Sequence, residues 1–139
     1  IDVFKENLYT KEEMKMIDET HKILGDDSIG ITSTTVRVPV YRSHAESVNV
    51  ELTEELSVEE AKAAMSAFPG VIVEDNPAEM EYPMPLFTSG KDDVSVGRIR
   101  KDYSIAHGLN FWVVGDQIRK GAALNALQIA EYMIDHNMI

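Results

Sequence analysis

The sequence contains no cysteine. Disulfide bonds, thiolate metal sites and a cysteine nucleophile are therefore excluded within these 139 residues. Basic residues are also few, since 13 Lys and Arg stand against 24 Asp and Glu and give a formal net charge of −11. Nucleic acids and anionic membranes bind clustered Lys and Arg, so neither is expected as a partner. The four histidines lack metal-ligand spacing, and no metal site is expected.

Long apolar runs are missing as well. None approaches the ~20 residues of a membrane span, and the first residues lack the layout of a secretory signal peptide. A cytoplasmic location is therefore expected. The sequence starts at Ile1 without a methionine, which fits a processed or excised piece of a longer chain. With 44% hydrophobic and 27% charged residues it has the composition of a globular domain, long enough for one core.

Two capping boxes predict two helices. In each, a hydroxyl residue is followed three positions later by a glutamate, at Thr10–Glu13 and at Ser57–Glu60. The first helix is predicted over 11–24 because Gly25 is a natural C-terminal stop. The second is predicted over 58–68.

Alternation of β-branched residues with other residues predicts two early strands. The first covers 29–40, with three valines on one face, and the second covers 47–52. We expect them to pair as a hairpin around the turn 41–43, with His44 at its mouth. The valines predicted to face inward are Val36, Val38 and Val40.

The rest of the chain predicts three more strands and a long final helix. The strands cover 71–73, 94–100 and 109–114, and a proline-rich irregular connection over 75–93 joins the first two. A wide apolar face marks the helix 116–135. The order αββαβββα predicts an α+β fold with helices on one face of a mixed, largely antiparallel sheet.

Arg37 and His44 are the residues most suited to chemistry. A guanidinium can bind a carboxylate through two parallel hydrogen bonds. An imidazole can accept or donate a proton near neutral pH. Glu12 and Lys15 project from one side of the first helical turn. All four patterns also fit ordinary surface or structural residues, because single exposed ion pairs and lone histidines are common in proteins without a site.

Several short motifs occur in the order found in aspartate-semialdehyde dehydrogenases. The chain resembles the C-terminal domain of that family over nearly all of residues 1–139, as a single substrate-binding and dimerisation domain. The final helix 116–135 would then pack on a separate nucleotide-binding domain. The segments that carry the resemblance are Phe4–Asn7, Tyr9–Lys15, Glu19–Leu24, Val36–Val40, His44–Ser47, Gly97–Arg100 and Gly115–Gln117.

The resemblance implies a role for each of five residues. Glu12 would hold the amino group of the substrate, and Arg37 its carboxylate. Lys15 would help to bind the phosphate that attacks the acyl-enzyme. His44 would be the general acid and base. Gln117 would contact NADP.

The resemblance also implies a reaction and an assembly. The family reduces L-4-aspartyl phosphate to L-aspartate 4-semialdehyde with NADPH, through a cysteine thioester, in lysine (diaminopimelate), methionine and threonine biosynthesis. Its members are homodimers. This sequence has neither the cysteine nor a Gly-rich dinucleotide loop. Both are expected upstream of Ile1, and the isolated chain is expected to be inactive.

Two other functions fit the same residues. One is a free-standing, non-catalytic homologue that acts by protein association. The other is a stand-alone isomerase or lyase that uses His44 with Glu12. The sequence immediately upstream of Ile1 would separate the first alternative from the dehydrogenase.

Overall fold

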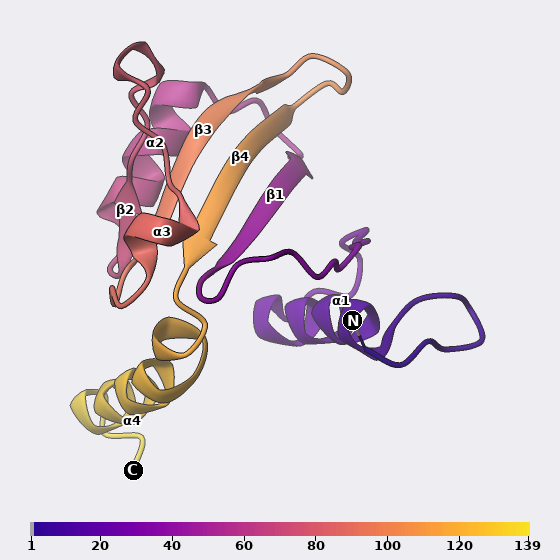
Figure 1. The fold of residues 1–139 in the computed structure, drawn as a ribbon, viewed down its shortest axis with the longest axis vertical. Coiled ribbons are helices and arrows are strands. Elements are labelled where there is room, and N and C mark those ends of the chain that lie inside the picture. The colour runs from indigo at the N-terminus through magenta and orange to yellow at the C-terminus, as the bar shows by residue number, and fades with distance from the viewer. Residues whose placement is uncertain (1) are drawn as a thin grey trace. The chain divides into compact units, whose positions relative to one another are not determined.

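The computed structural model describes residues 2–139, which form two compact units, 2–39 and Val40–Ile139. The first unit contains helix α1 (Lys11–Leu24), and the second contains all the strands (Figure 1). In chain order the second unit consists of β1 (His44–Glu51), α2 (Val58–Ala67), β2 (Val71–Val73), the 3₁₀ turn η1 (Pro77–Glu79), α3 (Pro85–Thr88), β3 (Val94–Asp102), β4 (Gly108–Gly115), the π-helical turn η2 (Arg119–Ala123) and α4 (Leu124–Asp135).

Helix α1 begins and ends where the sequence predicts. The Thr10 hydroxyl accepts the Glu13 N–H at 3.1 Å, and the Glu13 carboxylate accepts the Thr10 N–H at 2.7 Å. These reciprocal bonds satisfy two N–H groups that the first turn leaves without helical partners. Gly25 ends the helix in the left-handed conformation, with φ of 67°. The predicted capping box and stop are confirmed.

The four strands form one mixed sheet in the order β1-β4-β3-β2. The β1–β4 and β3–β4 pairs are antiparallel, whereas β2 pairs with β3 in parallel. Alternate apolar residues of the strands pack with helix α2 on one face of the sheet (Figure 1). The predicted α+β class and mixed sheet are confirmed. The buried centre of this core is Ala61, Val96, Ile99 and Leu109.

The predicted strand 29–40 and its hairpin are wrong. These residues are in neither a strand nor a helix, and Val36, Val38 and Val40 are 71%, 53% and 44% exposed. Alternation favours an extended backbone but cannot supply a hydrogen-bonding partner. Strand β1 instead pairs along all eight of its residues with β4, from His44 opposite Gly115 to Glu51 opposite Gly108.

The final helix also differs from the prediction. Asp116 does cap its start, because Oδ1 accepts the Ile118 N–H at 2.9 Å. The chain then makes a π-helical turn before α4 begins at Leu124. None of the α4 residues is buried, and the predicted apolar face is largely exposed in this chain.

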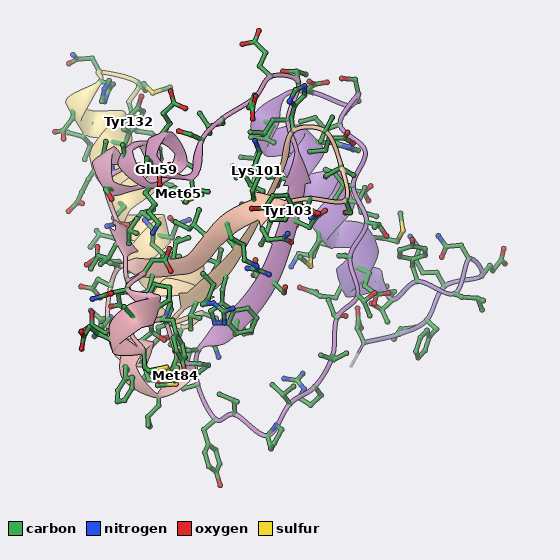
Figure 2. The ribbon with its side chains drawn as sticks, turned by 90° about the horizontal axis from the view of Figure 1, so that it is seen from above. Glu59, Met65, Met84, Lys101, Tyr103 and Tyr132 are labelled. Carbon is green, nitrogen blue, oxygen red and sulfur yellow. The ribbon has the colours of Figure 1, made fainter. Side chains whose placement is uncertain are left out.

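The connection 75–93 is more ordered than predicted, since it contains η1 and α3. The Trp112 indole Nε1–H donates to the Pro83 carbonyl at 3.1 Å and holds this connection against β4. Figure 2 shows Met84 just before α3, and Lys101 with Tyr103 at the end of β3. Within residues 2–139, no helix is both long and apolar enough to cross a membrane.

Candidate functional site

The pairing of β1 with β4 brings two predicted site residues to one end of the sheet. His44 is the first residue of β1 and lies opposite Gly115, the last residue of β4. Because the strands are antiparallel, the entry to β1 meets the exit from β4. Gln117 follows that exit by two residues. His44 is exposed and Gln117 is half-buried.

The residue before His44 has an unusual backbone. Ser43 is 7% exposed and has φ of 75°, in the left-handed region that L-residues with a Cβ rarely adopt. Its N–H donates to Oε1 of Gln117 at 2.8 Å. Its hydroxyl accepts from the Thr88 hydroxyl at 3.1 Å and lies 3.2 Å from the Ser89 hydroxyl. The turn is thus attached to both the β4–η2 junction and α3.

A buried carboxylate, Asp116, is paired with the same turn through Arg42. Asp116 is fully buried and accepts the Gly90 N–H at 2.7 Å, the Ile118 N–H at 2.9 Å and the Arg119 N–H at 3.3 Å. Arg42 Nε lies 2.8 Å from Oδ2 of Asp116 and forms an ion pair with it. The geometry of this contact is not that of a hydrogen bond.

The charge state of Asp116 follows from these contacts. Burial raises the pKa of Asp116, but the three backbone N–H donors and the Arg42 charge outweigh burial. Its pKa therefore lies below the usual range, and the group is ionised at neutral pH.

The other three predicted site residues lie in the first unit. Glu12 Oε1 and Lys15 Nζ are 3.7 Å apart on the first turns of α1, and both side chains are more than half exposed. Arg37 is exposed. Two residues before it, the Thr35 N–H donates to Oε1 of Glu13 at 2.8 Å, which attaches this segment to helix α1. The N–H donors of Thr10 and Thr35 hold the pKa of Glu13 below its usual range.

The five predicted residues are therefore grouped as three and two. Glu12, Lys15 and Arg37 belong to the first unit, and His44 and Gln117 to the second.

Sequence reasoning missed two residues of the second unit, Ser43 and Thr88, and in the first unit it missed the second contact of Glu13. Thr88 and Ser43 are 45 positions apart, and no sequence pattern links them. The capping box did single out Glu13, but only as a helix start.

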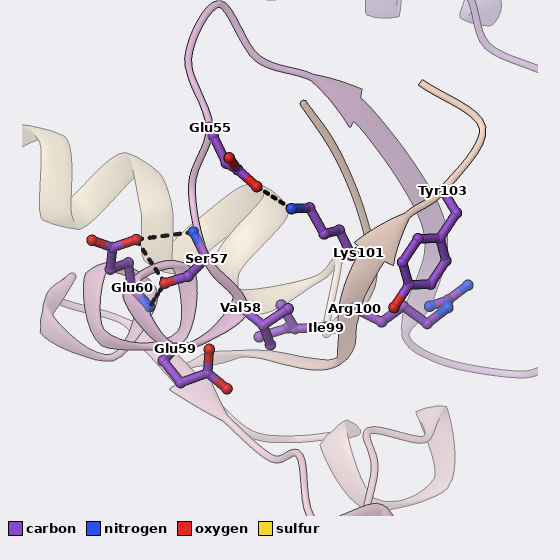
Figure 3. Close-up of a pocket in the computed structure, with 9 residues that line it drawn as sticks. All are labelled: Glu55, Ser57, Val58, Glu59, Glu60, Ile99, Arg100, Lys101 and Tyr103. Atoms are coloured by element: carbon purple, nitrogen blue, oxygen red, sulfur yellow. Dashed lines mark hydrogen bonds and ion pairs between the residues drawn. The ribbon is translucent and has the colours of Figure 1, made fainter. Parts of the chain in front are cut away.

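One surface hollow lies away from this end of the sheet. It measures about 650 Å³ and is lined by the start of α2 and the end of β3, with an ion pair between Glu55 and Lys101 at its edge (Figure 3). None of the five predicted site residues lines it. Within residues 2–139, no three His, Asp or Glu side chains are grouped as metal ligands would be.

Comparison with known proteins identifies the family. Residues 1–120 match the family model described as "Semialdehyde dehydrogenase, dimerisation domain". All 139 residues align with the aspartate-semialdehyde dehydrogenase of Aquifex aeolicus at 53% identity, covering 41% of that protein. The Bacillus subtilis enzyme of the same name is 46% identical over 140 aligned residues, 40% of its length.

A solved structure agrees with these alignments. Aspartate semialdehyde dehydrogenase II from Vibrio cholerae, crystallised in complex with ASA, matches 97% of this chain and 40% of its own, with a TM-score of 0.92 and 45% identity. The chain thus spans about two fifths of the length of the relatives it matches. These findings confirm the resemblance drawn from the sequence motifs. The chain belongs to the semialdehyde dehydrogenase dimerisation-domain family.

Proposed function

We propose that this chain is the substrate-binding and dimerisation part of an NADP-dependent aspartate-semialdehyde dehydrogenase. The reaction would be the reductive dephosphorylation of L-4-aspartyl phosphate to L-aspartate 4-semialdehyde, in the biosynthesis of lysine, methionine and threonine. The observation that carries the proposal is the placement of His44 opposite Gly115, beside Gln117, in a chain that matches such enzymes over its full length.

Each residue has a role that suits its chemistry. The Arg37 guanidinium is exposed and offers two parallel N–H donors to the substrate carboxylate. Glu12 would pair with the substrate amino group, and Lys15 would bind phosphate. Their mutual ion pair is long at 3.7 Å and exposed, so a ligand can replace it at little cost. His44 would exchange a proton with the reacting oxygen or phosphate.

NADP, when bound, supplies the nicotinamide that exchanges hydride with the substrate. Gln117 is the residue of this chain that would contact it. Its Oε1 already accepts the Ser43 N–H, so its amide N–H groups are the ones that can donate to the cofactor. One such side chain contributes about 0.5–1.5 kcal/mol per hydrogen bond. Most of the cofactor affinity, and the cysteine nucleophile, would therefore come from outside these 139 residues.

The exposed apolar residues of α4 would pack on the nucleotide-binding part of the enzyme. Leu127, Ile129, Tyr132 and Ile134 are each more than half exposed. Leu127 and Ile134 lie on one side of the helix, and Ile129 and Tyr132 lie on the opposite side. A helix that is apolar on more than one side is expected to be covered by other elements. The homodimer would form through this chain, in keeping with the dimerisation domain that the family model describes.

The test is an assay of NADP reduction by the full-length protein that contains this chain, with aspartate semialdehyde and phosphate as substrates. The full-length protein should turn over. The 139-residue chain alone should not, because it contains no cysteine to form the acyl-enzyme. A full-length protein without turnover, or turnover by the isolated chain, would contradict the proposal.

A further inference from the structure

The residue before His44 is held in a conformation that it would not adopt unaided. A non-glycine residue in the left-handed region costs roughly 1–2 kcal/mol, so the neighbours of Ser43 must stabilise it. Ser43 has φ of 75° and is almost fully buried. Strain of this kind is typical of functional sites, where the surrounding structure fixes a particular direction of the chain.

The shortest of the contacts that hold Ser43 comes from Gln117. The Ser43 N–H can only donate, so the oxygen of the Gln117 amide must face it, at 2.8 Å. The Thr88 hydroxyl, which is fully buried, donates to the Ser43 hydroxyl at 3.1 Å. The first contact holds the backbone N–H of Ser43, and the second holds its side-chain hydroxyl.

The backbone conformation of Ser43 determines how the chain enters β1 at His44. His44 immediately follows and begins β1, where its pairing partner is Gly115. Gln117 lies two residues beyond Gly115 on the same chain segment. The segment 115–117 therefore has two contacts here: Gly115 pairs with His44, and Gln117 holds Ser43, the residue before His44.

We propose that Gln117 is a positioning residue for His44, acting through the Ser43 backbone, in addition to any contact with the cofactor. The inference rests on the proposed role of His44 as the general acid and base. The two roles of Gln117 would use different atoms of its amide: the oxygen accepts the Ser43 N–H, and the N–H groups would donate to the cofactor. They can therefore be separated by substitution.

The experiment measures kcat and the KM for NADP in the full-length enzyme for two variants of similar size. Gln117→Leu removes the acceptor and the donors. It should lower kcat by about tenfold or more, since a displacement of about 1 Å can cost about 10²-fold in rate. Gln117→Glu keeps an oxygen acceptor for Ser43 and loses the donors. It should recover at least about fivefold of the lost kcat while its KM for NADP stays raised.

A double-mutant cycle with His44→Asn separates positioning from general damage. If Gln117 acts through His44, Gln117→Leu should lower kcat by no more than about twofold when His44 is already replaced, because the two residues are then fully coupled. A structural or purely cofactor-binding role predicts the same loss in both backgrounds. If Gln117→Leu does not fold, Gln117→Asn replaces it in both experiments. Its side chain is one methylene shorter, so its oxygen no longer reaches the Ser43 N–H, and the same changes in kcat are expected.

The outcomes distinguish two kinds of failure. Equal losses in both backgrounds, or no recovery of kcat in Gln117→Glu, would overturn the positioning role and leave the proposed function standing. A wild-type enzyme without turnover would overturn the proposed function and the positioning role with it. An unchanged kcat in His44→Asn would overturn the catalytic role of His44, and with it the positioning role of Gln117.

Discussion

At the residue scale, the geometry of Arg37 makes a prediction about substrate binding. Arg37→Lys keeps the positive charge but loses the planar pair of donors that matches a carboxylate. Hydrogen bonds to charged groups contribute about 1.5–3 kcal/mol each, so loss of one should raise KM for aspartate semialdehyde about tenfold or more. Steady-state kinetics of the full-length enzyme measure this effect.

The control for Arg37→Lys is Arg37→Leu, which loses the charge as well as the donors and should raise KM further. An unchanged KM in both variants would show that Arg37 is an ordinary exposed arginine.

Two adjacent glutamates show why single residues are hard to interpret from sequence. Glu12 is exposed and makes only a long contact to Lys15. Glu13 is buried, and its two oxygens accept the backbone N–H groups of Thr10 and Thr35. The capping box assigned one of these two bonds to Glu13. The bond to Thr35 depends on a segment 22 residues away, which local patterning does not describe.

At the scale of elements, the junction after β4 depends on an ionised carboxylate. Asp116→Asn keeps the shape but removes the charge opposite Arg42 and one pair of acceptor sites. We expect the Tm of the chain to fall by several degrees at pH 7. Backbone N–H donors and Arg42 hold the pKa of Asp116 below its usual range despite burial. The stabilisation is therefore complete above the unfolded pKa of about 3.9 and is lost as pH falls through the folded pKa.

Thermal unfolding of wild type and Asp116→Asn between pH 7 and pH 3 measures this dependence. The difference in Tm should shrink below about pH 4. Asp18→Asn, at an exposed position of α1, is the control and should change Tm little. A difference between wild type and Asp116→Asn that stays constant down to pH 3 would show that the charge of Asp116 does not stabilise the junction.

Elements with a local signature were predicted from the sequence, and those that need a distant partner were not. The capping boxes at Thr10 and Ser57 placed two helices within a residue or so. The later strands and the mixed sheet were also predicted. The segment 29–40 has the alternation of a strand, yet its Thr35 N–H is taken by a glutamate of α1. Pairing is a property of two segments, and the sequence of one could not show that β4 is the partner of β1.

The candidate site was predicted residue by residue but without its supports. Arg37 and His44 were identified by their chemistry, and Glu12, Lys15 and Gln117 by resemblance. The structure tests none of these roles, which remain predictions. What it adds is the network around Ser43, where contacts span 45 and 74 positions of sequence.

At the scale of the whole molecule, the chain should self-associate. It belongs to a dimerisation-domain family, and two-fold dimers are the commonest symmetric assembly. Light scattering at micromolar concentration and about 0.15 M salt, where screening reduces repulsion between chains of charge −11, should give twice the 15.5 kDa chain mass. A mass of 15.5 kDa under these conditions would contradict the prediction.

The exposed apolar residues of α4 allow a second, less specific contact between copies. Ile129→Glu, at an exposed position of α4, serves as the control, since it should leave a dimer formed through the rest of the chain intact while suppressing larger species. If the substitution instead converts the dimer to a monomer, the dimer contact lies on α4.

The most direct test of the account is kcat of the full-length enzyme carrying His44→Asn. Asparagine keeps the size and some hydrogen bonding of the imidazole but cannot transfer a proton at neutral pH. If the end of the sheet where His44 meets Gly115 is half of the active site, kcat should fall by about 10²–10⁴-fold, with KM and Tm little changed. If His44→Asn instead lowers Tm while its folded fraction turns over at the wild-type rate, His44 is a structural residue and the site assignment is wrong.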